Sequence, residues 1–139
     1  MADSVRDVMT SDPKTVDAGD NVEDAAKIMA EADIGAVVVI DDDKVAGIVT
    51  DRDIVVRVVA AGENPSKTDV SDAASGGADT IEADASIDDA VKLMREKDIR
   101  RLPVVEDDKP IGIVSLGDIA KEQDADSALG DISSAEPNN

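Results

Sequence analysis

The chain has 139 residues and a formal net charge of -19, because 33 Asp and Glu residues outnumber 14 Lys and Arg residues. This length fits one domain of ordinary size. The acidic balance disfavours binding to nucleic acid or to an anionic membrane surface, since Lys and Arg supply most of the affinity for phosphates. The absence of Cys and His removes disulfides and thiolate chemistry. No apolar run approaches the roughly 20 residues of a membrane span, and no signal peptide is recognisable, so we expect a cytoplasmic protein.

The first part of the chain predicts a strand, a helix, a hairpin and a second helix. A short strand at residues 15–16 precedes a helix that Asp20 or Asn21 can cap. Two β-branched runs separated by a short acidic turn predict a hairpin over residues 36–49. Residues 53–60 return to a helical pattern. The apolar positions of the first helix keep the three-four spacing of one buried face: Val22, Ala25, Ala26, Met29 and Ala32.

The second part of the chain repeats this order. When the chain is shifted by 65 residues, residues 5–55 align with residues 70–120 without a gap, and 20 of the 51 pairs are identical. The predicted fold class is therefore α/β, with two pseudo-symmetric repeats of β-α-β-β-α order that share one core. We divide the chain into a first repeat, a linker, a second repeat and an acidic disordered tail at residues 1–61, 62–69, 70–123 and 124–139.

Each repeat closes with a Gly-Ile-Val-hydroxyl-x-x-Asp motif, at residues 47–53 and 112–118. The strand stops at the hydroxyl residue and a helix begins there, so free backbone N–H groups and the positive end of the helix dipole favour an anion at the strand end. The hydroxyl can hydrogen-bond a phosphate, and the Asp one turn later can accept both hydroxyls of a ribose. For either copy alone an ordinary helix cap is the simpler interpretation. Two copies in the same register favour ligand binding.

The repeated frame resembles a tandem pair of cystathionine-β-synthase (CBS) domains. The resemblance lies in Ile-Arg-Arg-Leu-Pro-Val-Val at residues 99–105 and in the closing motif, and it covers about residues 4–123. It implies two halves packed through their sheets, with adenosine-containing ligands in two clefts: AMP, ADP, ATP, S-adenosylmethionine or NAD. It also implies a non-catalytic regulatory sensor that forms disc-shaped homodimers and signals to a regulated protein that the sequence does not name.

The resemblance places residues from both repeats around each cleft. In each cleft the Asp of one closing motif would hold the ribose. The first cleft would be formed by Ile48, Thr50, Asp53, Ala78, Asp79, Thr80, Arg100, Arg101 and Pro103. The second would be formed by Met9, Lys14, Thr15, Ile34, Gly35, Ala36, Ile113, Ser115 and Asp118.

The two clefts differ in charge. Residues 100–101 are both Arg, whereas the aligned residues 35–36 are Gly and Ala, so the first cleft alone has a guanidinium pair able to hold phosphate in a fork. A solvated pair that screens nearby acids is the alternative explanation. Asp51 and Asp79 add negative charge, which weakens the case for a triphosphate unless Mg²⁺ accompanies it. With no aromatic residue to hold adenine, we expect micromolar or weaker affinity, about 8 kcal/mol or less.

Three other functions compete with ligand sensing. Catalysis by a carboxylate pair is disfavoured, because His and Cys are missing and solubility explains the abundant acids. Metal binding by residues 41–43 is also disfavoured, because the run lacks the alternate spacing and the Gly of a calcium loop. A ligand-free module that dimerises or docks on a transporter, kinase or enzyme remains the alternative. The nearly all-apolar helix at residues 54–59 could supply such an interface.

The composition predicts a halophile-like dependence of stability on salt. An acidic surface with few Lys and no Phe, Tyr or Trp suits a salt-rich cytoplasm, where exposed charges are screened. We expect the chain to unfold when salt is removed, because repulsion among its acids is then unscreened. Circular dichroism across a salt series measures this, and undiminished stability in dilute buffer would contradict it.

Overall fold

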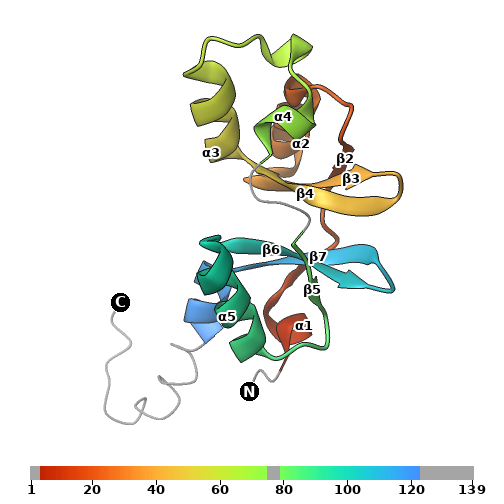
Figure 1. Cartoon of the computed structure of the whole chain (residues 1–139), viewed down its shortest axis with the longest axis vertical. Helices are drawn as coiled ribbons and strands as arrows, with labels where there is room; N and C mark the ends of the chain where they lie inside the picture. Colours follow the sequence, from red (N-terminus) through yellow and green to blue (C-terminus); the bar gives the residue numbers. More distant parts are fainter. Residues whose placement is uncertain (1–3, 75–78, 123–139) are drawn as a thin grey trace.

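The structure is a computed structural model that describes residues 4–74 and 79–122, and both repeats have the predicted order of elements (Figure 1). The predicted tail lies outside the described residues. The first repeat forms β2 Thr15–Asp17, α2 Val22–Ala32, β3 Ala36–Asp41, β4 Lys44–Thr50 and α3 Asp51–Ile54, which continues as a π-helix, η1 Val55–Val59. The second repeat forms β5 Ile81–Glu82, α5 Ile87–Lys97, β6 Arg101–Glu106 and β7 Lys109–Ser115, followed by helical residues 116–122. The remaining elements are α1 Val5–Val8, β1 Thr10–Ser11, η2 Pro65–Lys67 and α4 Val70–Ala73.

The strand pairing repeats with the same offset as the sequence. β2 runs parallel to β3, which is antiparallel to β4, and β5 runs parallel to β6, which is antiparallel to β7. Val16 pairs with Val39, and 65 residues later Ile81 pairs with Val104. Each hairpin also has one irregularity, directly after Val39 or directly after Val104. The pseudo-symmetry predicted from the sequence is therefore confirmed down to the strand register.

Aspartates at equivalent positions form the turns of both repeats. Asp42 and Asp43 have φ values of 53° and 65°, and Asp107 and Asp108 have 53° and 64°. A two-residue hairpin turn with both φ angles positive matches the twist of the flanking strands, and Asp tolerates this region better than most residues. The acidic turns thus have a structural role.

The leading segment of each repeat packs on the other repeat. Val5 of α1 is fully buried among residues of the second repeat, and β1 pairs with β7. Conversely, Val70 and Ala73 of α4 are fully buried in the core of the first repeat. We call residues 14–61 with α4 the first half, and residues 79–122 with residues 4–11 the second half.

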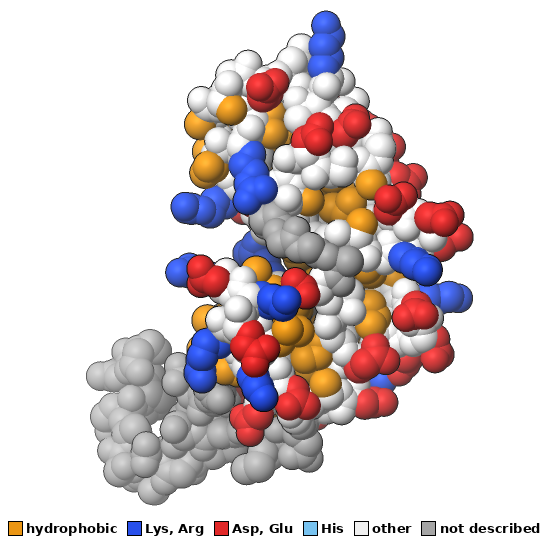
Figure 2. Space-filling view, in the orientation of Figure 1, with side chains coloured by type: hydrophobic (Ala, Val, Ile, Leu, Met, Phe, Trp, Pro, Cys, Tyr) orange, Lys and Arg blue, Asp and Glu red, His pale blue; other side chains and the backbone are white. Residues whose placement is uncertain are grey.

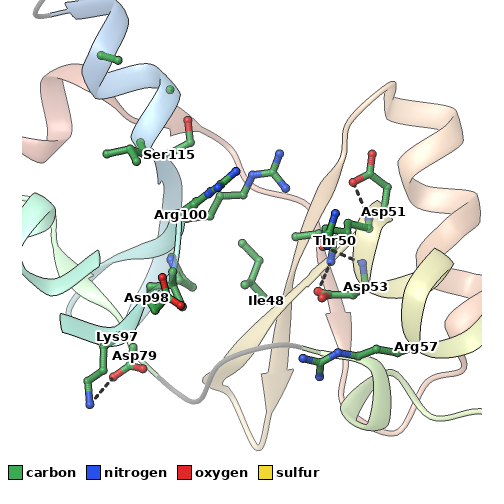
Figure 3. Close-up of a pocket in the computed structure, with 17 residues that line it drawn as sticks. Ile48, Thr50, Asp51, Asp53, Arg57, Asp79, Lys97, Asp98, Arg100 and Ser115 are labelled. Carbon is green, nitrogen blue, oxygen red and sulfur yellow. Dashed lines mark hydrogen bonds and ion pairs between the residues drawn. The ribbon is translucent and has the colours of Figure 1, made fainter. Parts of the chain in front are cut away.

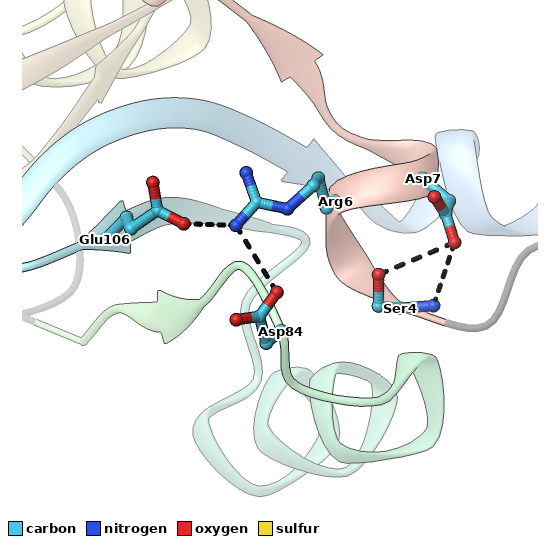
Figure 4. A network of polar contacts seen from close by, with 5 residues as sticks. All are labelled: Ser4, Arg6, Asp7, Asp84 and Glu106. Carbon is cyan, nitrogen blue, oxygen red and sulfur yellow. Dashed lines mark hydrogen bonds and ion pairs between the residues drawn. The ribbon is translucent and has the colours of Figure 1, made fainter.

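An ion-pair network also attaches α1 to the second half (Figure 4). Arg6 donates to Glu106 and, over 3.3 Å, to Asp84, and the hydrogen bond with Glu106 is the main cause that raises the pKa of Arg6 above its ordinary value. Because these side chains are exposed, screening by solvent and salt limits their contribution to stability. The burial of Val5 is the larger contribution to the position of α1.

The halves meet through their sheets. Val38, Val45 and Val105 form an apolar cluster, with Ile40 and Ile113 packed against it. The sheets lie in the middle of the molecule and the helices lie outside them (Figure 1). Among the described residues, no helix is long and apolar enough to cross a bilayer. The predicted packing through sheets is confirmed, and it leaves the strand ends of both halves beside one another.

The approach of β1 to β7 requires a glycine at position 112. A Cβ atom there would lie 2.9 Å from the Thr10 carbonyl oxygen and 2.6 Å from Met9 Sδ. We expect Gly112→Ala to lower the free energy of unfolding by about 1–3 kcal/mol, because the backbone of β1 must move. Denaturant unfolding at high salt measures this.

Gly19→Ala is the matched control, because a Cβ atom at Gly19 would meet nothing within 4 Å. Its effect should stay within about 0.5 kcal/mol. Equal unfolding midpoints for the two variants would contradict the proposed close contact.

Candidate functional site

A cavity of about 1110 Å³ opens between the two halves (Figure 3). The first half contributes the end of β4 and the helix that follows it. The second half contributes the end of α5, the start of β6 and the end of β7 with the helix after it. The carboxyl ends of β4 and β7 thus both reach this cavity, as expected for strands related by an internal two-fold.

The structure brings together most of the residues predicted for the first cleft. Seven of the nine line the cavity: Ile48, Thr50, Asp53, Asp79, Arg100, Arg101 and Pro103. Thr80 is not among the lining residues, and Ala78 lies outside the described residues.

The residues predicted for the second cleft are not brought together in the same way. Ser115 lines the large cavity, whereas Lys14 and Thr15 line a separate cavity of about 320 Å³ beside α2. The other six line neither cavity: Met9, Ile34, Gly35, Ala36, Ile113 and Asp118. Side chains pack against two glycines among and beside these residues. Met9 lies against Gly112, and the Asp51 carboxylate lies against Gly35.

Both closing motifs form helix caps. Thr50 N donates to Asp53 Oδ2 over 2.9 Å, and Asp53 N donates to Thr50 Oγ1 over 3.1 Å. Ser115 and Asp118 make the same two hydrogen bonds, over 3.3 and 3.0 Å. Asp53 is only 8% exposed, and hydrogen bonding offsets part of the cost of burying its carboxylate. The capping function therefore exists in both copies, and position within the cavity distinguishes Asp53 from Asp118.

The cavity concentrates the positive charge of an acidic protein. Five of the chain's 14 cationic residues line it, together with four acids, Asp51, Asp53, Asp79 and Asp98. Lys and Arg side chains lie on both sides of the recess between the halves (Figure 2). The five cations are Arg52, Arg57, Lys97, Arg100 and Arg101. A chain with a net charge of -19 thus places five cations against four acids here, which favours an anionic ligand.

None of these cations has a cationic counterpart in the other repeat. At the positions 65 residues away, the sequence has Gly117, Glu122, Ala32, Gly35 and Ala36. The arginine pair at residues 100–101 was predicted for this cavity, whereas Arg52, Arg57 and Lys97 were not. The alignment of Arg57 with Glu122, a reversal of charge at one position of the repeat, was a signal that could have found it.

Arg57 is placed by the π-helix. Ala60 N donates to Val55 O and Glu63 N donates to Val58 O, both across five residues. The sequence predicted a helix here, and the structure differs in its type: η1 is a π-helix, a form that occurs mostly as single turns inside α-helices and frequently at functional sites. Arg57 Nη1 donates to Ala74 O over 3.2 Å, and its side chain extends beneath Asp53 in Figure 3.

The apolar part of the cavity is aliphatic. Ile48, Ile99 and Pro103 line it, and the sequence contains no Phe, Tyr or Trp. Such walls can hold a flat base by dispersion and area burial but without aromatic stacking. At the edge of the cavity, Lys97 Nζ lies 3.9 Å from Asp79 Oδ1.

Fold and site together define a duplicated α/β module with a cation-lined cavity between its halves. The chain belongs to the CBS domain family, whose model matches residues 5–60 and 68–125. CBS domain pairs are generally regulatory modules, and CBS domains in general bind adenosine ligands.

Three relatives are similar over most of their length. Protein YlbB of Bacillus subtilis is 40% identical over 93% of this chain and 90% of its own. The crystal structure of Hypoxic Response Protein I with two coordinated zinc ions superposes with a TM-score of 0.73, at 35% identity over 85% of this chain and 97% of that one. The hexameric CBS-CP12 protein from bloom-forming cyanobacteria superposes with a TM-score of 0.78, at 28% identity over 89% of this chain and 73% of that one.

The zinc ions of Hypoxic Response Protein I raise the question of a metal site in this chain. The sequence contains no His or Cys, the nitrogen and sulfur ligands that zinc prefers. Within residues 4–74 and 79–122, no group of three or more acidic residues is placed to hold a metal ion.

Proposed function

We propose that this protein is a non-catalytic regulatory module that binds an adenosine nucleotide, AMP, ADP or ATP, in the large cavity and signals its occupancy to a partner. The supporting observation is the gathering of five cations around one cavity of a strongly acidic chain. Phosphate is the ligand group that such a cluster best accommodates, since guanidinium groups bind it in a charge-assisted fork.

The nucleotide would bind to residues from both halves. Asp53 would accept the ribose hydroxyls, the aliphatic side chains of Ile48 and Pro103 would flank the base, and the Arg pair at residues 100–101 would hold the phosphate. The cations disfavour S-adenosylmethionine, which carries a positive sulfonium, and leave NAD as the other anionic candidate. One or two cavity carboxylates together with the phosphates would be enough for Mg²⁺ to accompany ATP.

The second predicted cleft is the weaker candidate. Asp118 lies outside both cavities, and the counterparts of the five cavity cations include no Lys or Arg. Lys14 alone would supply positive charge there. We therefore assign the tighter binding event to the cavity that contains Asp53.

A ligand-free docking or dimerisation module is the second candidate function. Val55, Val56 and Val59 on η1 are 57%, 50% and 60% exposed, and Leu116 at the equivalent helix of the second half is 42% exposed. The apolar face of η1 suits burial against a second copy of the chain, with Leu116 as a smaller contribution from the second half, and we propose a homodimer that uses it.

The panel of ligands separates the two functions. At high salt, AMP or ATP should raise the Tm in a thermal-shift measurement. A ligand at 100 times its Kd adds about 2.7 kcal/mol to the free energy of unfolding. Sensing requires stabilisation by at least one of AMP, ATP, S-adenosylmethionine and NAD. An unchanged Tm with all four, together with a dimeric mass by light scattering, would favour the docking module instead.

Three variants test the choice of cavity by calorimetry. Asp53→Ala and Arg101→Ala should each weaken nucleotide binding about tenfold or more, because each removes a charged partner worth about 1.5–3 kcal/mol. Asp118→Ala is the matched control, because it removes the same helix cap in the other copy. Its affinity should be nearly unchanged, and the reverse pattern would show that the second cleft holds the nucleotide.

A further inference from the structure

The polar contacts of the described residues lie mostly within one half. Four ion pairs among the described residues join residues of the same half: Arg6 with Asp84 and Glu106, Lys27 with Glu23, and Lys97 with Asp79. Arg101 behaves differently. From the start of β6 in the second half, its Nη1 donates to the carbonyl oxygen of Gly35 in the first half, over 3.4 Å.

This hydrogen bond between the halves can be released at little cost. A length of 3.4 Å is at the weak end for an N–H···O hydrogen bond. The Gly35 carbonyl also accepts from Asp51 N over 3.0 Å, so it keeps a partner when Arg101 leaves. A carbonyl that stays bonded avoids the desolvation penalty that a lost partner usually brings.

The hydrogen bond between Arg101 and Gly35 has no counterpart related by the internal two-fold. The internal two-fold relates Gly35 to Arg100, whose carbonyl accepts from Leu116 N over 2.8 Å just as the Gly35 carbonyl accepts from Asp51 N. The counterpart of Arg101, however, is Ala36, which has no side-chain donor. Arg101 is therefore a feature that the second repeat adds to the shared frame.

The same guanidinium lines the large cavity, where it is half-buried. A phosphate placed there would offer two charged acceptors, which a guanidinium can bind in a fork, in place of one neutral carbonyl. An uncharged ligand offers no such exchange.

We propose that Arg101 makes the phosphate of a bound adenosine nucleotide the signal, by leaving the Gly35 carbonyl for the phosphate and so loosening the contact between the halves. This inference rests on the proposed function and adds to it. Anionic adenosine phosphates would carry the signal, whereas adenosine, which fits the same base and ribose contacts, would occupy the cavity without releasing the contact.

Hydrogen exchange of the full-length chain tests this proposal. The exchange rates of the backbone amides of β3 and β6 are the readout, because Gly35 directly precedes β3 and Arg101 begins β6. The amides of α2 are the internal reference. Saturating AMP should accelerate exchange in β3 and β6 at least twofold relative to α2, and saturating adenosine should not. Without ligand, Arg101→Met should already show the faster exchange, and AMP should add nothing further.

Two variants serve as controls. Arg100→Met removes the neighbouring guanidinium of the cavity, so it should weaken AMP binding but keep the exchange response once saturated. Arg95→Met removes an exposed charge on α5 that does not line the cavity, so ligand-free exchange should match that of the original chain.

The outcomes separate this inference from the function it rests on. If AMP binds in calorimetry without accelerating exchange, or if Arg101→Met still responds to AMP, the inference is wrong and the binding function stands. If no nucleotide binds, the proposed function fails, and the ligand-free comparison of Arg101→Met with Arg95→Met still decides whether the contact restrains the halves. Equal exchange in those two variants would overturn the inference that Arg101 restrains the halves.

Discussion

The face-to-face packing of two small sheets is the constraint on which the rest of the structure depends. Neither sheet is large: within residues 4–74 and 79–122, one has three strands and the other four. Units of this size are marginally stable alone, and the cluster around Val38 and Val105 covers the inner faces of both sheets. Because the halves are related by an internal two-fold, this packing also brings two strand ends, and two closing motifs, to one cavity.

Charge then distinguishes two halves that the backbone makes nearly equivalent. The closing motifs form the same helix caps, so the backbone offers similar binding features in both copies. Side chains break the symmetry, since the first copy faces arginines where the second faces Gly and Ala. An acidic surface disfavours anions everywhere else, so a local group of cations has a larger effect on selectivity here than on a neutral protein.

The sequence predicted the elements that depend on local patterns. β-branched runs and acidic turns predicted both hairpins, the duplication predicted the two-fold, and the family resemblance placed the arginine pair in the cavity. What it did not predict depends on contacts between distant residues. The packing of α1 on the second half, the separation of Lys14 from Ser115 and the entry of Arg57 into the cavity all follow from tertiary packing, which no periodicity in the sequence encodes.

The exchange of leading helices between the repeats has a consequence for folding and for the origin of the fold. Each half-core is closed by a leading helix that belongs in sequence to the other repeat: α1 packs on the half that begins some 75 residues later, and α4 packs on the half that precedes it. A single ancestral repeat would have lacked its closing helix unless another copy donated one, so reciprocal swapping in a dimer offers a route to this architecture that gene fusion would preserve. In the present chain the same topology means that synthesis must reach the second repeat before either core is complete.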